Sequence, residues 1–119
     1  MNEVAKALYN FWSSFGLPAC VEGYVPDDWQ LPYITYSLVR PEWRSQATHY
    51  ARIWYRDSAY TGITDIIKSI ESRIDGGVTI PVGDGFIAIF KDSQFVQFIP
   101  DEDVTVKTAY LSLILEVNL

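Results

Sequence analysis

The chain has 119 residues, 49% of them hydrophobic, and no change in composition divides it, so we expect a single domain spanning residues 1–119. Its formal net charge of −6 argues against a protein that grips nucleic-acid phosphates, because such proteins carry a basic surplus. A single cysteine and a single histidine exclude an internal disulfide and a zinc site built from these two residue types.

The N-terminal third predicts one helix and one strand. Apolar side chains recur at helical spacing over residues 2–14, and Gly16 and Pro18 then end that helix. Residues 32–39 alternate in a β-branched and aromatic pattern that is typical of a strand. Between them, residues 19–25 are compatible with a short additional strand, whose pairing the sequence leaves open.

The middle of the chain predicts a strand followed by a helix. Side chains alternate over residues 48–56, which predicts a strand that pairs with the strand before it. Asp57 and Ser58 are placed to cap the next helix, and Gly76 and Gly77 allow a left-handed turn at its end. Five isoleucines at steps of three and four residues share one stripe of this helix, which we expect to pack across the sheet: Ile63, Ile66, Ile67, Ile70 and Ile74.

Three more strands are predicted in the C-terminal part. Residues 86–91 and 94–99 form two of them, joined by a hairpin turn at Asp92-Ser93 that lacks the usual glycine. Residues 104–117 form the longest alternating run and are the best candidate for a central strand. The chain therefore predicts an α+β fold in the order α-(β)-β-β-α-β-β-β, with a mainly antiparallel sheet and two helices packed on one face.

No arrangement of residues in the sequence predicts catalysis. His49 lies within an alternating strand, which favours a structural or surface role over a catalytic one. Cys20 has no basic neighbour in sequence, which favours a small core residue over a reactive thiol. Nucleophile, zinc-protease and nucleotide-binding motifs are absent from the sequence. Asp101, Glu102 and Asp103 lack the spaced ligands of a calcium loop, which favours a solvated turn over a metal site. We therefore expect no enzyme activity, no metal and no cofactor.

Aromatic residues are numerous: 4 Trp, 8 Tyr and 6 Phe are more than one sheet face and two helices can bury. Trp54 shares one side of its strand with Tyr50 and two arginines, a composition typical of interface hot spots. Two alternatives stay open: the arginines cover the rings on an ordinary solvent face, or Trp54 lies under the helices while Ile53 faces outward. With three residues of the preceding connection, the candidate interface residues are Arg40, Trp43, Arg44, Arg52, Trp54 and Arg56.

Four stretches of the chain, taken in order, carry a family pattern: Pro32-Tyr33-Ile34-Thr35-Tyr36; Ile53-Trp54-Tyr55-Arg56-Asp57-Ser58 with the isoleucine-rich helix; Phe95-Val96-Gln97-Phe98-Ile99-Pro100-Asp101-Glu102-Asp103; and Lys107-Thr108-Ala109-Tyr110-Leu111. With the N-terminal helix, this pattern resembles the tail terminator (tail completion) proteins of tailed phages, in the version found in phages and phage-tail-like particles of Gram-positive bacteria. Such proteins are often labelled minor structural proteins. The resemblance covers most of the chain from residue 32 onward and rests on order and pattern.

The resemblance implies a small α+β subunit that assembles with itself as a ring, usually a hexamer, on the last ring of the tail tube. The ring ends tube polymerisation and offers a docking face to the neck or, in a headless particle, closes the collar end. The implied partners are copies of the chain itself, the tail tube protein, a neck or head-connector protein and, in a contractile tail, the sheath protein. Such a ring needs a head-to-tail contact on the flanks of each subunit.

Within this hypothesis, Asp101, Glu102 and Asp103 form a candidate acidic loop that faces the lumen or a neighbouring subunit. An acidic channel wall repels DNA phosphates, so no tight nucleic-acid binding is expected. The sequence has no signal-peptide pattern and no apolar run of membrane-spanning length, which predicts a protein that is not exported by that route. The resemblance implies synthesis in the bacterial host cytoplasm and a place in the virion or tail-like particle. Two other functions stay open: a head-tail joining (neck) protein, and a monomeric ligand-binding or enzymatic α+β domain.

Overall fold

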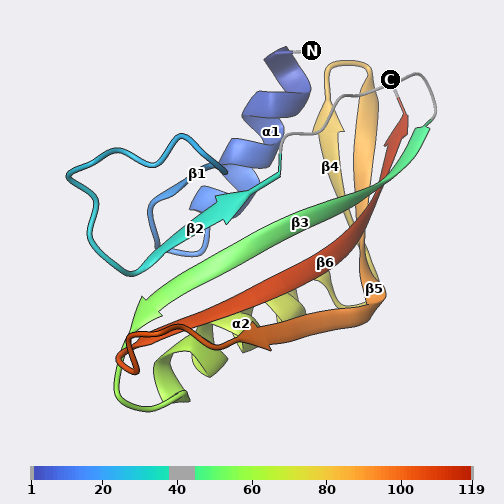
Figure 1. The fold of residues 1–119 in the computed structure, drawn as a ribbon. Helices are drawn as coiled ribbons and strands as arrows, with labels where there is room; N and C mark the ends of the chain where they lie inside the picture. The colour runs from blue at the N-terminus through green and yellow to red at the C-terminus, as the bar shows by residue number, and fades with distance from the viewer. Residues whose placement is uncertain (1, 38–44, 119) are drawn as a thin grey trace.

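A computed structural model describes residues 2–37 and 45–118 of the chain. Two helices and six strands follow one another in the order shown in Figure 1: α1 (Asn2–Ser13), β1 (Ala19–Val21), β2 (Tyr33–Tyr36), β3 (Ser45–Arg56), α2 (Thr61–Ile74), β4 (Val78–Val82), β5 (Gly85–Ile99) and β6 (Val106–Asn118).

The six strands form one mixed sheet in the order β1-β2-β3-β6-β5-β4, and this sheet curls into a half-barrel. The long strands β3 and β6 pair antiparallel at its centre, from Ser45 opposite Val117 to Arg56 opposite Val106 (Figure 1). The predicted central position of the last strand is therefore confirmed. The short strand that the sequence left open is present as β1. It pairs with β2 in parallel, whereas the other neighbouring strands are antiparallel.

The predicted sheet arrangement, a mainly antiparallel sheet with two helices packed on one face, is wrong. The domain is a small α+β domain, but its sheet is mixed and curled, so the helices fill a trough. The predicted hairpin at Asp92-Ser93 is also wrong, because β5 runs through it as one strand. Between the pairs Lys91 with Leu113 and Val96 with Leu111, β5 advances by five residues and β6 by two, so β5 carries an irregular bulge at this point.

The two helices cover different parts of the trough. α1 contacts both edge strands, β1 and β4, while α2 packs against β3, β5 and β6 (Figure 1). Burial follows the alternation of the strands: Ile53 is buried in the core, and Trp54 points away from it, which removes the alternative in which Trp54 lies under the helices. The helix residues buried in this core are Val4, Leu8, Phe11, Trp12, Ile63, Ile67, Ile70 and Ile74.

The predicted cap of α2 is wrong at one end and confirmed at the other. The helix begins at Thr61, and its N-cap residue, Tyr60, makes no side-chain capping bond. The carboxylate of Asp57 instead accepts a hydrogen bond from the backbone N–H of Ala59 at 3.2 Å, so it shapes the turn before the helix. At the C-terminal end, Gly76 and Gly77 have positive φ angles of 75° and 94°, as expected of a left-handed stop.

The two glycines after α2 give a matched pair of substitutions. A Cβ on Gly76 meets nothing within 4 Å, so Gly76→Ala should cost only the left-handed backbone strain, about 1–2 kcal/mol. A Cβ on Gly77 lies 2.6 Å from a ring atom of Phe90, so Gly77→Ala should lose about 2–4 kcal/mol through strain and overpacking together. Urea unfolding of both variants measures the difference, and equal losses would show that the Phe90 ring gives way freely.

Candidate functional site

The side of the sheet away from the helices carries all three candidate interface residues that the structure describes, Arg52, Trp54 and Arg56. We call this side the open face; it is formed by alternate residues of β2, β3 and β6. Across it runs a set of side chains that we call the arginine–aromatic row: Tyr33, Trp54, Arg52, Tyr110 and Tyr50. The row exists because cross-strand pairing places Tyr33 opposite Trp54 and Arg52 opposite Tyr110.

Arg52 is held between two aromatic rings in the middle of the row. Its guanidinium carbon lies 3.9 Å from the ring centroid of Trp54 and 5.0 Å from that of Tyr110. The guanidinium donates to the hydroxyl of Thr108 at 3.3 Å, while its buried Nε has no hydrogen-bond partner among the described residues. Within residues 2–37 and 45–118, no carboxylate forms a salt bridge with it. Arg52 is thus a cation with unused donor capacity, fixed by rings that stabilise its charge.

Trp54 is fixed as firmly as Arg52. Its indole N–H donates to the hydroxyl of Thr35 at 3.1 Å, and its ring lies 6.0 Å from that of Tyr33. These contacts leave both tryptophan and arginine in defined orientations on a half-buried surface. A fixed aromatic and arginine pair loses little side-chain entropy on binding a partner, which suits a protein contact.

Arg56 continues the open face toward the acidic loop. Its guanidinium forms a salt bridge with Asp103 at 3.3 Å and donates to the Thr105 hydroxyl at 2.8 Å. The hydroxyl and the backbone N–H of Thr105 donate to Asp103, and together with Arg56 they hold the pKa of this carboxyl below its usual value. The backbone N–H of Asp103 donates to Asp101, and Glu102 is exposed. The loop is therefore shaped by hydrogen bonds of its own side chains.

The structure thus brings together five of the residues singled out in the sequence. Arg52, Trp54 and Arg56 follow one side of β3, and Asp101 and Asp103 meet the end of that strand. A sixth candidate, Glu102, is exposed on the same loop, and the other three, Arg40, Trp43 and Arg44, lie outside the described residues.

His49 lies in a buried network that the sequence did not predict. Its Nε2 accepts the indole N–H of Trp12 at 2.9 Å, and its Nδ1 lies 3.1 Å from the hydroxyl oxygen of Ser37. Since an indole only donates, Nε2 must be unprotonated and Nδ1–H must donate to Ser37. Burial lowers the pKa of His49 to about 4, which is consistent with this neutral ring.

This network does not support general-base catalysis by His49. The ring nitrogen that faces Ser37 already carries a proton, and the free lone pair on Nε2 is occupied by Trp12. The Ser37 hydroxyl also accepts the backbone N–H of Tyr50 at 3.0 Å. His49 therefore joins α1 to the sheet. The only hint of burial in the sequence was its place on the same side of β3 as Ile53.

Among the described residues, neither Cys20 nor the acidic side chains form an activated thiol or a metal site. Cys20 is half-buried, and burial raises the pKa of its thiol, so the reactive thiolate is disfavoured. Across the described ranges, no three His, Cys, Asp or Glu side chains are grouped in a way that could hold a metal ion. Neither helix in this part of the chain is long and apolar enough to cross a bilayer.

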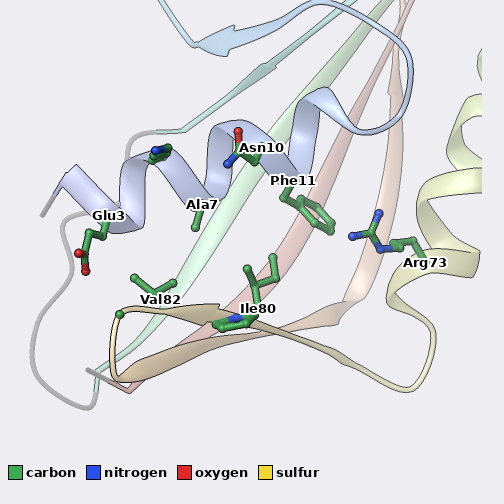
Figure 2. A pocket seen from close by; sticks show the side chains of 10 residues that line it. Glu3, Ala7, Asn10, Phe11, Arg73, Ile80 and Val82 are labelled. Atoms are coloured by element: carbon green, nitrogen blue, oxygen red, sulfur yellow. The ribbon is translucent and has the colours of Figure 1, made fainter.

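A pocket of about 350 Å³ lies between α1 and β4, on the helix side of the sheet (Figure 2). Arg73 of α2 reaches its rim, but its guanidinium already donates to Ser14 at 3.2 Å and lies 5.5 Å from the ring of Phe11. This guanidinium is therefore partly engaged by a residue that does not line the pocket. Its other lining residues include Glu3, Lys6, Ala7, Asn10, Ile80 and Val82.

Comparison with protein-family models and with curated proteins finds no match for this sequence. The chemistry of the open face is therefore what bears on function.

Proposed function

We propose that this chain is a structural assembly protein that forms a ring on the end of a phage tail tube, ends tube polymerisation and provides the docking face for the neck or collar. The observation that supports this proposal best is Arg52. A half-buried guanidinium is fixed between two rings, and its buried Nε finds no partner in the part of the chain that the structure describes. Such a group is suited to complete its hydrogen bonds with a partner protein. Its position on an open sheet face leaves room for that partner.

The sheet edges favour contacts through side chains over pairing of strands between subunits. Pro81 lies in the edge strand β4 and has no N–H to donate to an added strand. The opposite edge, β1, has only three residues. Two different flanks are what a head-to-tail ring requires, because the same contact must repeat until rotation closes it.

The acidic balance of the chain fits a ring around a DNA channel. With a net charge of −6, a lumen wall of this protein repels phosphates and lets a genome pass without sticking. In this proposal the partners are copies of the chain, the tail tube protein, a neck or head-connector protein and, in a contractile tail, the sheath protein.

Electron microscopy of particles assembled without this chain tests the proposed function. Tubes that are overlong or ragged are expected, because nothing stops their polymerisation. Tails of normal length that lack heads would contradict termination and would instead support the alternative of a head-tail joining protein. Turnover of a small substrate by the pure protein would contradict both assembly functions.

The role of Arg52 has a separate test in self-association of the pure protein. Arg52→Glu should weaken self-association at least tenfold, because it places a carboxylate where a cation meets the partner. Lys68→Glu makes the same charge change on the exposed side of α2 and should leave association unchanged. Arg52→Gln keeps the side chain polar and covers the case in which the glutamate variant does not fold. Sedimentation measures all three, and normal association of both Arg52 variants would contradict the assignment.

A further inference from the structure

A pocket of about 520 Å³ lies at the end of the open face where β2 begins and β3 ends. We call it the end pocket. Three half-buried rings line it in series: the Trp29 ring centroid lies 5.9 Å from that of Tyr33, which lies 6.0 Å from that of Trp54. Arg56 and Asp101 complete its polar rim. A continuous aromatic wall of this kind attracts cationic side chains through the faces of its rings.

The charges around the end pocket add to this preference. Arg56 is already engaged by Asp103 and Thr105, so its charge is largely compensated. The loop that carries Trp29 also carries the exposed Asp27 and Asp28, and the loop on the other side carries the exposed Asp101 and Glu102. An aromatic wall between two acidic loops is complementary to an arginine-bearing segment.

We propose that the end pocket receives residues 38–44 of a second copy of this chain, a contact that rests on the ring assembly proposed above. This segment reads Leu-Val-Arg-Pro-Glu-Trp-Arg, and it brings Arg40 and Arg44 together in a chain that has only 9 Lys and Arg residues against 15 Asp and Glu residues. The two arginines match the acidic rims, and Trp43 offers a further ring to the aromatic wall.

The occupant has to come from another copy because of the length of β3. Arg44 is joined to Ser45, which lies nine residues before Trp54, or roughly 30 Å along an extended strand. Ser37 is anchored to Tyr50 by a backbone hydrogen bond of 2.7 Å, so the two described residues that flank the segment, Ser37 and Ser45, both lie at the first part of β3. The seven residues of the segment are too few to reach the end pocket of the same copy and return to Ser45.

The contact that results is head-to-tail. Ser45, to which the segment is joined, lies at one end of β3, and the end pocket lies at the other end. Each copy therefore offers one segment and one pocket, and the contact repeats from copy to copy. Such a heterologous contact closes into a ring when the rotation per subunit divides a full turn.

A peptide titration tests the end pocket directly. A capped peptide of residues 37–46 should shift the indole N–H resonances of Trp29 and Trp54 in the ¹⁵N-labelled full chain.

Variants of the pocket and of the peptide show whether binding uses the proposed contact. Trp29→Ala/Asp101→Asn in the chain should weaken peptide binding at least tenfold, and so should Arg40→Glu/Arg44→Glu in the peptide. The matched control Phe86→Ala/Asp84→Asn changes an exposed ring and an exposed carboxylate beside the turn between β4 and β5 and should leave binding unchanged. Asp101→Asn alone keeps the side-chain acceptor for Asp103 and covers the case in which the double variant is unfolded. Absence of a shift at millimolar peptide, or binding that ignores the pocket variants, overturns the proposal.

Mixing two variants tests the head-to-tail direction. Trp29→Ala/Asp101→Asn and Arg40→Glu/Arg44→Glu should each fail to self-associate, but their mixture should form a 1:1 pair, because one intact pocket then meets one intact segment. Light scattering separates this pair from larger rings. Rings formed by both variants alone would overturn the end-pocket contact and leave the ring function standing. Binding of the peptide, together with tubes of normal length in particles without the chain, would instead support the contact and remove the terminator function.

Discussion

Acidification from pH 7 to pH 4 is expected to lower the free energy of unfolding by about 3 kcal/mol through His49 alone. Burial lowers the pKa of His49 from 6.5 in the unfolded chain to about 4 in the folded one. Between these two values the unfolded chain binds the proton and the folded chain does not, so stability falls as the pH falls. Well above pH 6.5 the stabilising contribution of His49 is complete, and well below pH 4, where the folded and unfolded chains are both protonated, this group causes no further loss.

The free-energy cost of protonating His49 arises from its immediate contacts in the core. A proton on Nε2 of His49 would point at the indole N–H of Trp12, 2.9 Å away, and two donors would then face each other in the core. A charged ring would also be buried without a carboxylate among its described hydrogen-bond partners, which are Trp12 and Ser37.

Urea unfolding at pH 7, 6, 5 and 4 measures this effect, with His49→Gln as the control. Glutamine still offers an acceptor to Trp12 but does not titrate in this range, so the variant should show a much flatter pH dependence. Asp92 and Asp103, whose carboxyl pKa values are lowered by hydrogen bonds, titrate at lower pH and affect both proteins alike. Parallel curves for the two proteins would show that His49 is accessible to the proton in the folded state.

Leu113→Ala is the second substitution with a large expected effect, a loss of about 2–5 kcal/mol in the free energy of unfolding. Leu113 lies in the middle of β6, is fully buried, and pairs with His49 on one side and Lys91 on the other. Its removal leaves a cavity at the centre of the sheet, where the neighbouring strands are held by backbone pairing and cannot collapse around it.

Ile114→Ala provides the matched control on the next residue of the same strand. Ile114 points to the open face and is only partly buried, so its truncation should cost less than half of the loss at Leu113. Thermal or urea unfolding compares the two. An equal or larger loss at Ile114 would show that the open face is covered in the isolated protein and is not free for a partner.

Local pattern was enough to locate most of the helices and strands. The isoleucine spacing fixed the buried stripe of α2, and the alternation around Ile53 fixed β3, because 3.6-residue and two-residue periods follow from backbone geometry alone. The two faces of β3 could not be told apart in sequence, since Trp54 and Ile53 are both large and apolar. In the structure Ile53 is buried in the core, and Trp54 packs against Arg52 on the open face.

The candidate site was foreseen in composition but not in contacts. The sequence pointed to Arg52, Trp54 and Arg56 on one side of a strand, whereas the ring of Tyr110 that holds Arg52 comes from β6, 58 residues further along the chain. Trp29 lies in a loop with no periodic pattern, so nothing in the sequence joined it to Tyr33 and Trp54 in the end pocket.

What the sequence determined by itself was the periodicity of each segment, the acidic charge and the excess of aromatic residues. What only the tertiary structure decided was how segments far apart in the chain pair. The bulge in β5 replaced a predicted hairpin because β6 offers a continuous partner on both sides of Asp92-Ser93, and the hydroxyl of Ser112 donates to Asp92 at 2.8 Å within it. The parallel strand β1, the curl of the sheet and the burial of His49 arise in the same way, from partners that no local pattern contains.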